Sequence, residues 1–305
     1  MALFLILLIF LAAPPASASF NAAAKGTSSA GFLNLGSGAR GVAMGGAYSA
    51  VVDNAEAMFW NPAALLRVKN RSVTFMHAAY IASTYYDYGA YAQNLGDEDA
   101  FGVGLQYFSS GDMMETDVNG VDLGKFSPDD YALSFGYAML VHDIKLGFAL
   151  KYVHSTILYT AKTVTSDIGV MFPPVYDGKV RFAMVGSNIG GGLKYEEKTE
   201  ALPGIVKLGG AYTSNGFGLY SLDVGFPQDG SPYLAMGYEH PIRMSDPWSL
   251  LARCGFNSQT VGDIKGFTGA SFGFGVGYDK YVFDYAFSPL GELGAAHRMA
   301  VSVKF

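Results

Sequence analysis

Two short stretches of the chain spell patterns that carry catalytic or cofactor chemistry in other proteins. The first, residues 269–273, reads Gly-Ala-Ser-Phe-Gly, the pattern that exposes a nucleophilic serine where a strand turns sharply into a helix. Here it falls inside a run of alternating large and small residues that continues to Tyr278, which indicates a strand without such a turn. Ser271 and Gly273 are then small residues on one face of a strand, and we predict that the chain is not an enzyme.

The second stretch, residues 36–41, reads Gly-Ser-Gly-Ala-Arg-Gly, which matches the glycine fingerprint of dinucleotide-binding folds. Glu56 follows at the spacing of the acid that binds the ribose. The fingerprint has meaning only between a strand and a helix of a parallel βαβ unit, and no parallel-sheet pattern follows Gly45 and Gly46. The sequence therefore predicts no nucleotide cofactor.

Side chains that bind metals are scattered through the sequence. The five histidines lack the short spacing of zinc ligands; they are His77, His142, His154, His240 and His297. Between residues 112 and 122, one loop gathers aspartates and an asparagine whose oxygens suit calcium, although a solvated acidic loop explains them more simply. We predict that the chain holds no metal and no other cofactor.

Alternation of residue size is the strongest pattern in the sequence. In residues 131–139 every odd position is large and apolar and every even position is small, a period of two that is typical of a β-strand. The alternation resumes in residues 144–152, where Lys145 and Lys151 lie on the small face. A soluble sandwich would bury the large face, whereas a transmembrane barrel would turn it toward lipid and line its lumen with the charged face.

The composition favours the transmembrane barrel. Half of the 305 residues are hydrophobic, 14% are aromatic and only 15% are charged, against about a quarter charged in a typical soluble chain. After the first thirteen residues, no apolar run reaches the roughly 17 residues that a membrane helix needs, so the apolar surface fits strands. The net charge of −6 argues against nucleic acid as a partner, and the single cysteine, Cys254, excludes an intrachain disulfide.

Fourteen segments alternate over the length of about 9 to 11 residues that a tilted membrane strand requires. They are residues 72–80, 84–93, 100–109, 130–140, 144–156, 163–172, 179–188, 205–213, 217–226, 232–240, 248–256, 267–278, 281–288 and 296–305. An even number of such strands predicts an all-β fold, a 14-stranded antiparallel transmembrane β-barrel in residues 71–305 that is surrounded by outer-membrane lipid.

The positions of the charged residues and the lengths of the loops agree with the predicted barrel. Nine charged residues share the parity of the small residues, as they must because Arg or Lys on the lipid face costs roughly 2 to 4 kcal/mol; they are Asp167, Arg181, Lys207, Asp223, Glu239, Arg253, Asp284, Arg298 and Lys304. The long connectors, residues 110–129, 189–204 and 257–266, alternate with tight ones. Long loops are therefore predicted to gather at one end of the barrel.

The residues before the barrel differ in character. Residues 3–13 form an apolar run of signal-peptide length, and small residues lead to a predicted cleavage site after Ala18. Residues 1–18 are thus predicted to be a signal peptide of a protein of the cell outer membrane in a Gram-negative-type bacterium. Residues 19–70 are rich in glycine and carry short helical signals, one of them Asn61 followed by Pro62. We expect them to fill the lumen.

These same residues carry a family resemblance. Gly31-Phe32-Leu33, Gly38-Ala39-Arg40, Gly45-Gly46, Asp53-Asn54-Ala55 and Asn61-Pro62-Ala63 resemble the start of PorV/PorQ-family outer-membrane proteins. The later part is also similar to the plug of FadL-type long-chain fatty-acid transporters, although Ala64 replaces their usual glycine. The resemblance implies that the segment folds into the barrel as a hatch. It marks a hatch signature of Gly38, Ala39, Arg40, Gly45, Gly46, Asp53, Asn61, Pro62 and Ala63, and apolar hatch contacts at Phe32 and Leu33.

The end of the chain alternates to its last residue. This resembles the terminal strand that the outer-membrane assembly machinery recognises, with an assembly signal of Met299, Val301, Val303 and Phe305 on the lipid face.

Two functions remain open at this point. A FadL-like barrel would admit hydrophobic small molecules by passive uptake. A PorV/PorQ-type barrel would instead be a non-transporting accessory protein that binds a secreted protein during secretion or surface attachment.

Overall fold

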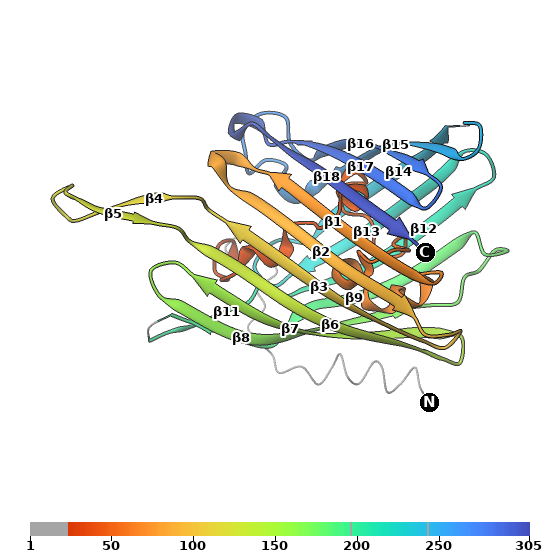
Figure 1. Ribbon diagram of the computed structural model, residues 1–305, viewed down its shortest axis with the longest axis horizontal. Coiled ribbons are helices and arrows are strands. Elements are labelled where there is room, and N and C mark those ends of the chain that lie inside the picture. The colour runs from red at the N-terminus through yellow and green to blue at the C-terminus, as the bar shows by residue number, and fades with distance from the viewer. Residues whose placement is uncertain (1–23, 196, 243) are drawn as a thin grey trace.

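A computed structural model of the protein describes residues 24–195, 197–242 and 244–305, and its main feature is a closed antiparallel β-barrel (Figure 1). The ring closes because β1 (Arg71–Ala79) pairs with β2 on one side and with the final strand, β18 (Ala295–Lys304), on the other. In the described residues no helix is long and apolar enough to cross a membrane. The predicted signal peptide, residues 1–18, and residues 19–23 lie outside the described residues.

The barrel contains the fourteen predicted strands, each with its ends within three residues of the prediction. Between β1 and β18 they are β2 (Tyr85–Asn94), β3 (Asp99–Ser109), β6 (Asp129–Val141), β7 (Ile144–Thr156), β8 (Thr160–Met171), β9 (Val180–Ile189), β12 (Ile205–Ser214), β13 (Gly218–Pro227), β14 (Tyr233–Ile242), β15 (Trp248–Asn257), β16 (Ala270–Tyr278) and β17 (Tyr281–Pro289). Two short hairpins in the loops were not predicted: β4 (Met113–Thr116) with β5 (Asp122–Phe126), and β10 (Gly192–Lys194) with β11 (Thr199–Ala201).

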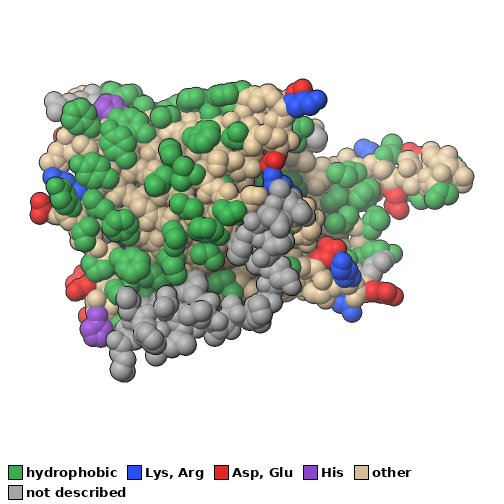
Figure 2. Space-filling model, turned by 180° about the vertical axis from the view of Figure 1, so that it is seen from behind, with side chains coloured by type: hydrophobic (Ala, Val, Ile, Leu, Met, Phe, Trp, Pro, Cys, Tyr) green, Lys and Arg blue, Asp and Glu red, His purple; other side chains and the backbone are tan. Residues whose placement is uncertain are grey.

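The two faces of each strand differ as the size alternation predicts. On β6 the outward Phe135 is 57% exposed, whereas its neighbours Ala132 and Ala138 on the luminal face are 1% and 0% exposed. Hydrophobic side chains cover the outer wall, and charged ones gather at its two ends (Figure 2). The large face therefore meets lipid and the small face meets the lumen, which identifies a transmembrane β-barrel.

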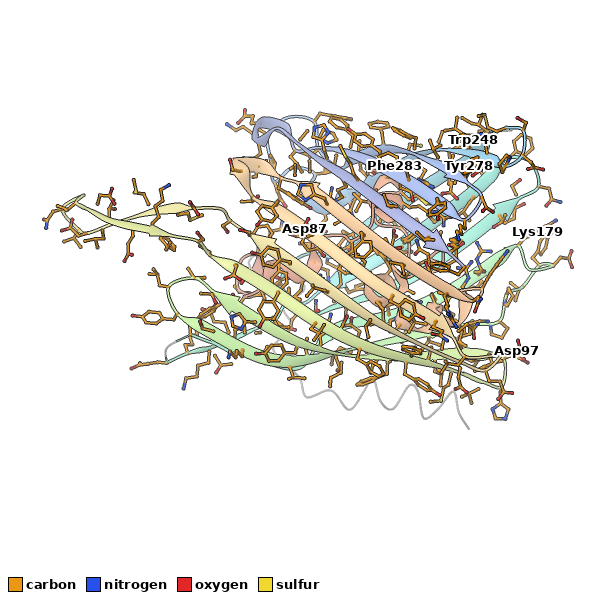
Figure 3. The ribbon with its side chains drawn as sticks, in the orientation of Figure 1. Asp87, Asp97, Lys179, Trp248, Tyr278 and Phe283 are labelled. Atoms are coloured by element: carbon orange, nitrogen blue, oxygen red, sulfur yellow. The ribbon has the colours of Figure 1, made fainter. Side chains whose placement is uncertain are left out.

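Aromatic residues mark one edge of the apolar band. Trp248 and Tyr278 are paired across β15 and β16, with ring centroids 4.8 Å apart, and they lie at the same end of the barrel as the charged turn residues Asp97 and Lys179 (Figure 3). Such aromatic rings stabilise a barrel at the boundary between lipid and water. We call this end, where the chain reaches Phe305, the inner end.

The opposite, outer end carries the longest connectors, residues 110–128, 190–204 and 258–269. The hairpin of β4 and β5 projects from this end well beyond the barrel (Figure 1). Two connectors differ from the predicted pattern of long loops at one end and tight turns at the other. Residues 157–159 form a tight turn at the outer end, and residues 172–179 form a longer link at the inner end. The predicted gathering of long loops at one end is nevertheless confirmed.

Residues 24–70, which we call the luminal segment, lie inside the barrel (Figure 1). The segment contains four short helices: η2 (Gly31–Asn34), α2 (Ala39–Ala43), α3 (Ala57–Trp60) and η3 (Pro62–Arg67). Outside the segment, the single-turn helices η4 (Ile81–Ser83), η5 (Ser258–Thr260) and η6 (Gly291–Leu293) lie in loops at the outer end. In the luminal segment, most side chains from residue 39 to residue 66 are buried and form one cluster with luminal alanines of the strands.

Glycine on the barrel wall lets the luminal segment approach closely. A Cβ atom on Gly147 of β7 would collide with the backbone of Ala63, and one on Gly255 of β15 would collide with the backbone of Gly45. Backbone cannot move aside as a flexible side chain can, so these sites exclude larger residues. The small luminal face of the strands is thus the surface that receives the segment.

Candidate ligand-binding site

An ion pair fixes the luminal segment to the barrel wall. Arg40 of α2 donates from Nε and Nη2 to the two carboxylate oxygens of Glu239 on β14, both at 2.8 Å. Its Nη1 donates to Asp53 at 3.0 Å, which joins two parts of the segment. Burial alone would raise the pKa of Asp53, but Arg40, Lys304 and Arg67 outweigh it and hold that pKa well below its usual range.

The pair extends into a buried network within the wall. Arg253 of β15 donates to Glu239 and to Asp284 of β17, each at 2.6 Å. Both are charge-assisted bonds between side chains that are almost fully buried. The network therefore ties three strands to the segment, and the resemblance-derived residues Arg40 and Asp53 both belong to it.

Glu56 lies at the centre of this region, and among the described residues neither of its carboxylate oxygens has a hydrogen-bond partner. Its burial, with Asp284 adding to the effect, raises the pKa of its carboxyl from the ordinary 4.5 to about 8. Gly38 lies directly against this carboxyl with a positive φ of 79°, so a side chain at that position would both strain the backbone and collide with Glu56. Ala39, the first residue of α2, is fully buried beside it.

The Asn-Pro-Ala stretch starts a helix as the sequence predicts. Asn61 Oδ1 accepts from the backbone N–H of Ala63 at 3.0 Å, and Pro62 is the first residue of η3. The Asn61 Nδ2 also donates to the carbonyl of Ser49 at 2.9 Å, which fixes the turn between α2 and α3. These residues give the segment its path across the lumen.

Gly45 and Gly46 place the segment against β15 and β16, beside the strands of the ion network. Both have positive φ, 68° and 80°, and the N–H of Gly45 donates to Ser271 Oγ at 3.0 Å. Ser271 donates in turn to the carbonyl of Ala43 at 3.1 Å. The serine of the Gly-x-Ser-x-Gly pattern is therefore a luminal residue of β16 that binds the segment, as the strand prediction implied. In the same way, the glycine fingerprint at residues 36–41 opens α2 inside an antiparallel barrel, with no βαβ unit around it.

The remaining predicted residues lie elsewhere. Phe32 and Leu33 are buried near the outer end in a separate cluster with residues of β6, β7, β8 and the loop 190–204. The predicted assembly signal, Met299, Val301, Val303 and Phe305, belongs to the outward face at the end of the chain. Neither group lines the cavity described next.

A cavity of about 270 Å³ lies in the outer half of the lumen, between the luminal segment and the wall. Aromatic and apolar side chains line much of it, together with a few polar groups. The lining includes Leu35, Val42, Phe59, Trp60, Tyr80, Tyr233, Pro289 and Leu290, the amides Asn34 and Asn257, and the cations Lys207 and Arg298. Such a pocket, mostly apolar with a few convergent polar groups, is the usual form of a small-molecule site.

The cavity lies beside the outer end of the barrel. It shares Asn34, Leu35 and Tyr233 with a second cavity of about 560 Å³ beneath the outer loops. A third cavity of about 580 Å³ at the inner end has no lining residue in common with it. Residues of the luminal segment line all three cavities, and the aromatic one adjoins the outer cavity and is separate from the inner one.

Sequence reasoning assigned Lys207 and Arg298 to the luminal face but gave them no role. The structure brings both to the same cavity, where the Lys207 Nζ lies 5.0 Å from the centroid of the Trp60 ring. The Arg298 guanidinium stacks on Tyr80 at 4.8 Å. The alternation along each strand indicated that the two cations face the lumen. No local pattern in the sequence indicated how deep in the lumen they lie.

Comparison with known proteins shows the fold. No family model and no curated sequence matches the chain. Among solved structures, a TodX monoaromatic hydrocarbon channel carrying a deltaS2S3 change has a TM-score of 0.59 at 14% identity, covering 88% of this chain and 99% of that chain. The Ralstonia pickettii toluene transporter TbuX has a TM-score of 0.60 at 14% identity, covering 88% and 98%. A Pseudomonas aeruginosa FadL homologue has a TM-score of 0.54 at 11% identity, covering 85% and 96%. The fold is therefore that of FadL-like barrels, while the PorV/PorQ resemblance receives no support from these matches.

Proposed function

We propose that the protein is an outer-membrane channel for the passive uptake of small hydrophobic molecules, with the luminal segment as its hatch. One observation carries the proposal: an aromatic cavity adjoins the outer cavity and is separate from the inner one, and it is lined in part by a segment held through an ion network. The solved structures that the chain resembles include toluene transporters, which supports the same class of permeant. Such a role needs no catalytic group.

Entry would be driven by desolvation. A hydrophobic molecule that moves from water into the cavity gains roughly 25 cal/mol for each Å² of apolar surface removed from water. Passage to the inner end then requires the luminal segment to shift, because the described cavities do not join across it. No energy source is needed, since the concentration gradient sets the direction of net flux.

Filling the cavity tests this proposal. Ala296 lines the cavity from β18, shares the luminal parity of Arg298 and takes no part in the ion network. Ala296→Phe should reduce the uptake of ethylbenzene into cells or proteoliposomes by at least about tenfold, because the added ring occupies the space of a ligand. The matched control is Ala252→Phe on β15, whose parity, opposite to that of buried Arg253, turns the new ring toward lipid. Equal uptake by the two variants would contradict the proposal.

The accessory role in secretion or surface attachment rests on the family resemblance alone. The projecting hairpin of β4 and β5 is the segment it would use. Deletion of residues 113–126 should leave ethylbenzene uptake unchanged if the protein is a channel. Recognition of Met299, Val301, Val303 and Phe305 by the assembly machinery likewise remains a proposal, supported by their outward position on the closing strand.

A further inference from the structure

The two cations that line the cavity lack the partners that most other luminal cations have. Among the described residues, Arg40, Arg253, Lys151 and Lys304 each form a salt bridge with a carboxylate, and Arg67 and Arg181 donate to backbone carbonyls of residues 50–52. Lys207 and Arg298 have neither kind of partner. Both line the same aromatic cavity.

Arg298 is 6% exposed and has only neutral oxygens beside it. Its guanidinium donates to the hydroxyls of Tyr80 and Ser288, and its Nε has no hydrogen-bond partner in the described chain. A buried guanidinium normally binds a carboxylate or phosphate, because an uncompensated buried charge is costly. The cavity therefore contains a cation that is stabilised fully only when an anion is present.

Lys207 offers a second positive group at the same cavity. Its ammonium lies over the Trp60 ring, and no carboxylate of the described chain is within salt-bridge distance. Asp223 on β13 is the carboxylate that would compete for it. Its Oδ2 accepts from Ser49 N and Oγ at 3.1 and 2.5 Å, and its Oδ1, which has no hydrogen-bond partner in the described chain, forms no salt bridge with Lys207. The ammonium thus remains available to a ligand that also contacts the Trp60 ring.

The volume limits the size of the ligand. An apolar cavity of about 150 Å³ holds benzene, and this one measures about 270 Å³. It can enclose one aromatic ring with a short acid arm, on the order of a dozen non-hydrogen atoms by that comparison, whereas an extended lipid chain would have to reach into the second, outer cavity.

From these observations we propose that the cavity selects compact aromatic carboxylates, with the ring against Trp60 and the carboxylate at Lys207 and Arg298. This inference rests on the proposed uptake function and names its substrate class. It sets the chain apart from the hydrocarbon channels whose fold it shares, since a neutral hydrocarbon would leave both cations unpaired.

Binding of matched probes tests the inference. The chain has two tryptophans, so Trp248→Phe leaves Trp60 as the only indole reporter in purified protein in a non-ionic detergent. Titration with 3-phenylpropionate should quench its fluorescence with an affinity about tenfold or more above that of 3-phenylpropanamide, which has the same shape without the charge. Palmitate should bind more weakly than 3-phenylpropionate.

Variants then assign the effect to the two cations. Lys207→Met and Arg298→Lys, each in the Trp248→Phe background, should lower the affinity for the acid toward that for the amide, and should lower it much more than they lower the affinity for the amide. Lys162→Met on β8, an exposed lysine outside the cavity, is the control. Equal binding of acid and amide, or no effect of Lys207→Met and Arg298→Lys, would overturn this inference and leave the uptake function standing. Failure of both ring probes to bind would count against the uptake function itself.

Discussion

Arg40 in the luminal segment and Glu239 on β14 form a two-point ion pair, with both nitrogen–oxygen distances at 2.8 Å although the residues are 199 positions apart. A bidentate pair of this kind fixes orientation as well as distance. It ties the luminal segment to the barrel wall, and Arg253 also donates to Glu239. Under the proposed function, loosening the pair should open the channel.

Arg40→Met removes this contact and leaves the buried Glu239 and the half-buried Asp53 with fewer partners. Breaking a buried pair by removal of one member costs about 3 to 5 kcal/mol. We expect a lower melting temperature together with faster ethylbenzene uptake, measured on purified protein and on proteoliposomes. Lys25→Met is the control, because the ion pair of Lys25 with Asp263 is exposed and such pairs contribute about 0 to 1 kcal/mol. Uptake that stays at the wild-type rate in Arg40→Met would argue against a hatch held by this pair.

Adjacent positions on β3 test which face meets lipid. Leu105 points outward and is 45% exposed, whereas Gln106 points into the lumen and is 5% exposed. Leu105→Lys should impair membrane assembly and lower stability by roughly 2 to 4 kcal/mol, because a charge then faces the hydrocarbon region. Gln106→Lys should be milder, since a long polar side chain already occupies that site. Heat-modifiable migration on gels reports the folded fraction, and equal loss in the two variants would undo the assignment of faces.

The strands could be predicted from sequence because successive side chains of each strand face lipid and lumen in turn. The alternation of Phe135 and its small neighbours is a property of a few consecutive residues. The hairpin of β4 and β5 could not be found in this way, since residues 113–116 and 122–126 are largely exposed on both faces and show no period of two. Nothing in a solvated hairpin selects one residue size for one face.

The site was less predictable, for a different physical reason. Charge parity placed Lys207 and Arg298 in the lumen, and the Asn-Pro pattern predicted the start of η3. That the two cations share a cavity with Trp60 depends on the stagger of distant strands and on the path of the luminal segment. Both are set by long-range packing, such as the contact of Gly147 with Ala63. In the sequence such a contact is visible only as a glycine, which does not identify its partner.

Gly147 provides a test of how closely the segment packs. A Cβ at this position would meet the backbone of Ala63, so Gly147→Ala must displace η3 or strain the strand. Overpacking of this kind costs typically about 1 to 3 kcal/mol. We expect the barrel to assemble while the luminal segment becomes more accessible to protease added from the inner end. Gly210→Ala on β12 is the control, because its Cβ would lie 3.8 Å from the Phe182 ring, an ordinary contact. Identical cleavage in the two variants would mean that η3 does not seal against β7.

The buried carboxyl of Glu56 predicts how stability depends on pH. Its pKa in the folded protein is about 8, against an ordinary 4.5, so between these values the folded state binds a proton that the unfolded state has released. Stability should therefore fall as pH rises through this window, and the loss should be complete above it. Glu56→Gln keeps the shape of the neutral carboxyl without the titration, so its melting temperature should decline less than that of the wild type between pH 5 and pH 9, both measured by thermal unfolding in detergent. Glu292→Gln, in an exposed turn at the outer end, should retain the wild-type decline. If Glu56→Gln also retains it, another group titrates in this range and Glu56 is not held neutral by its burial.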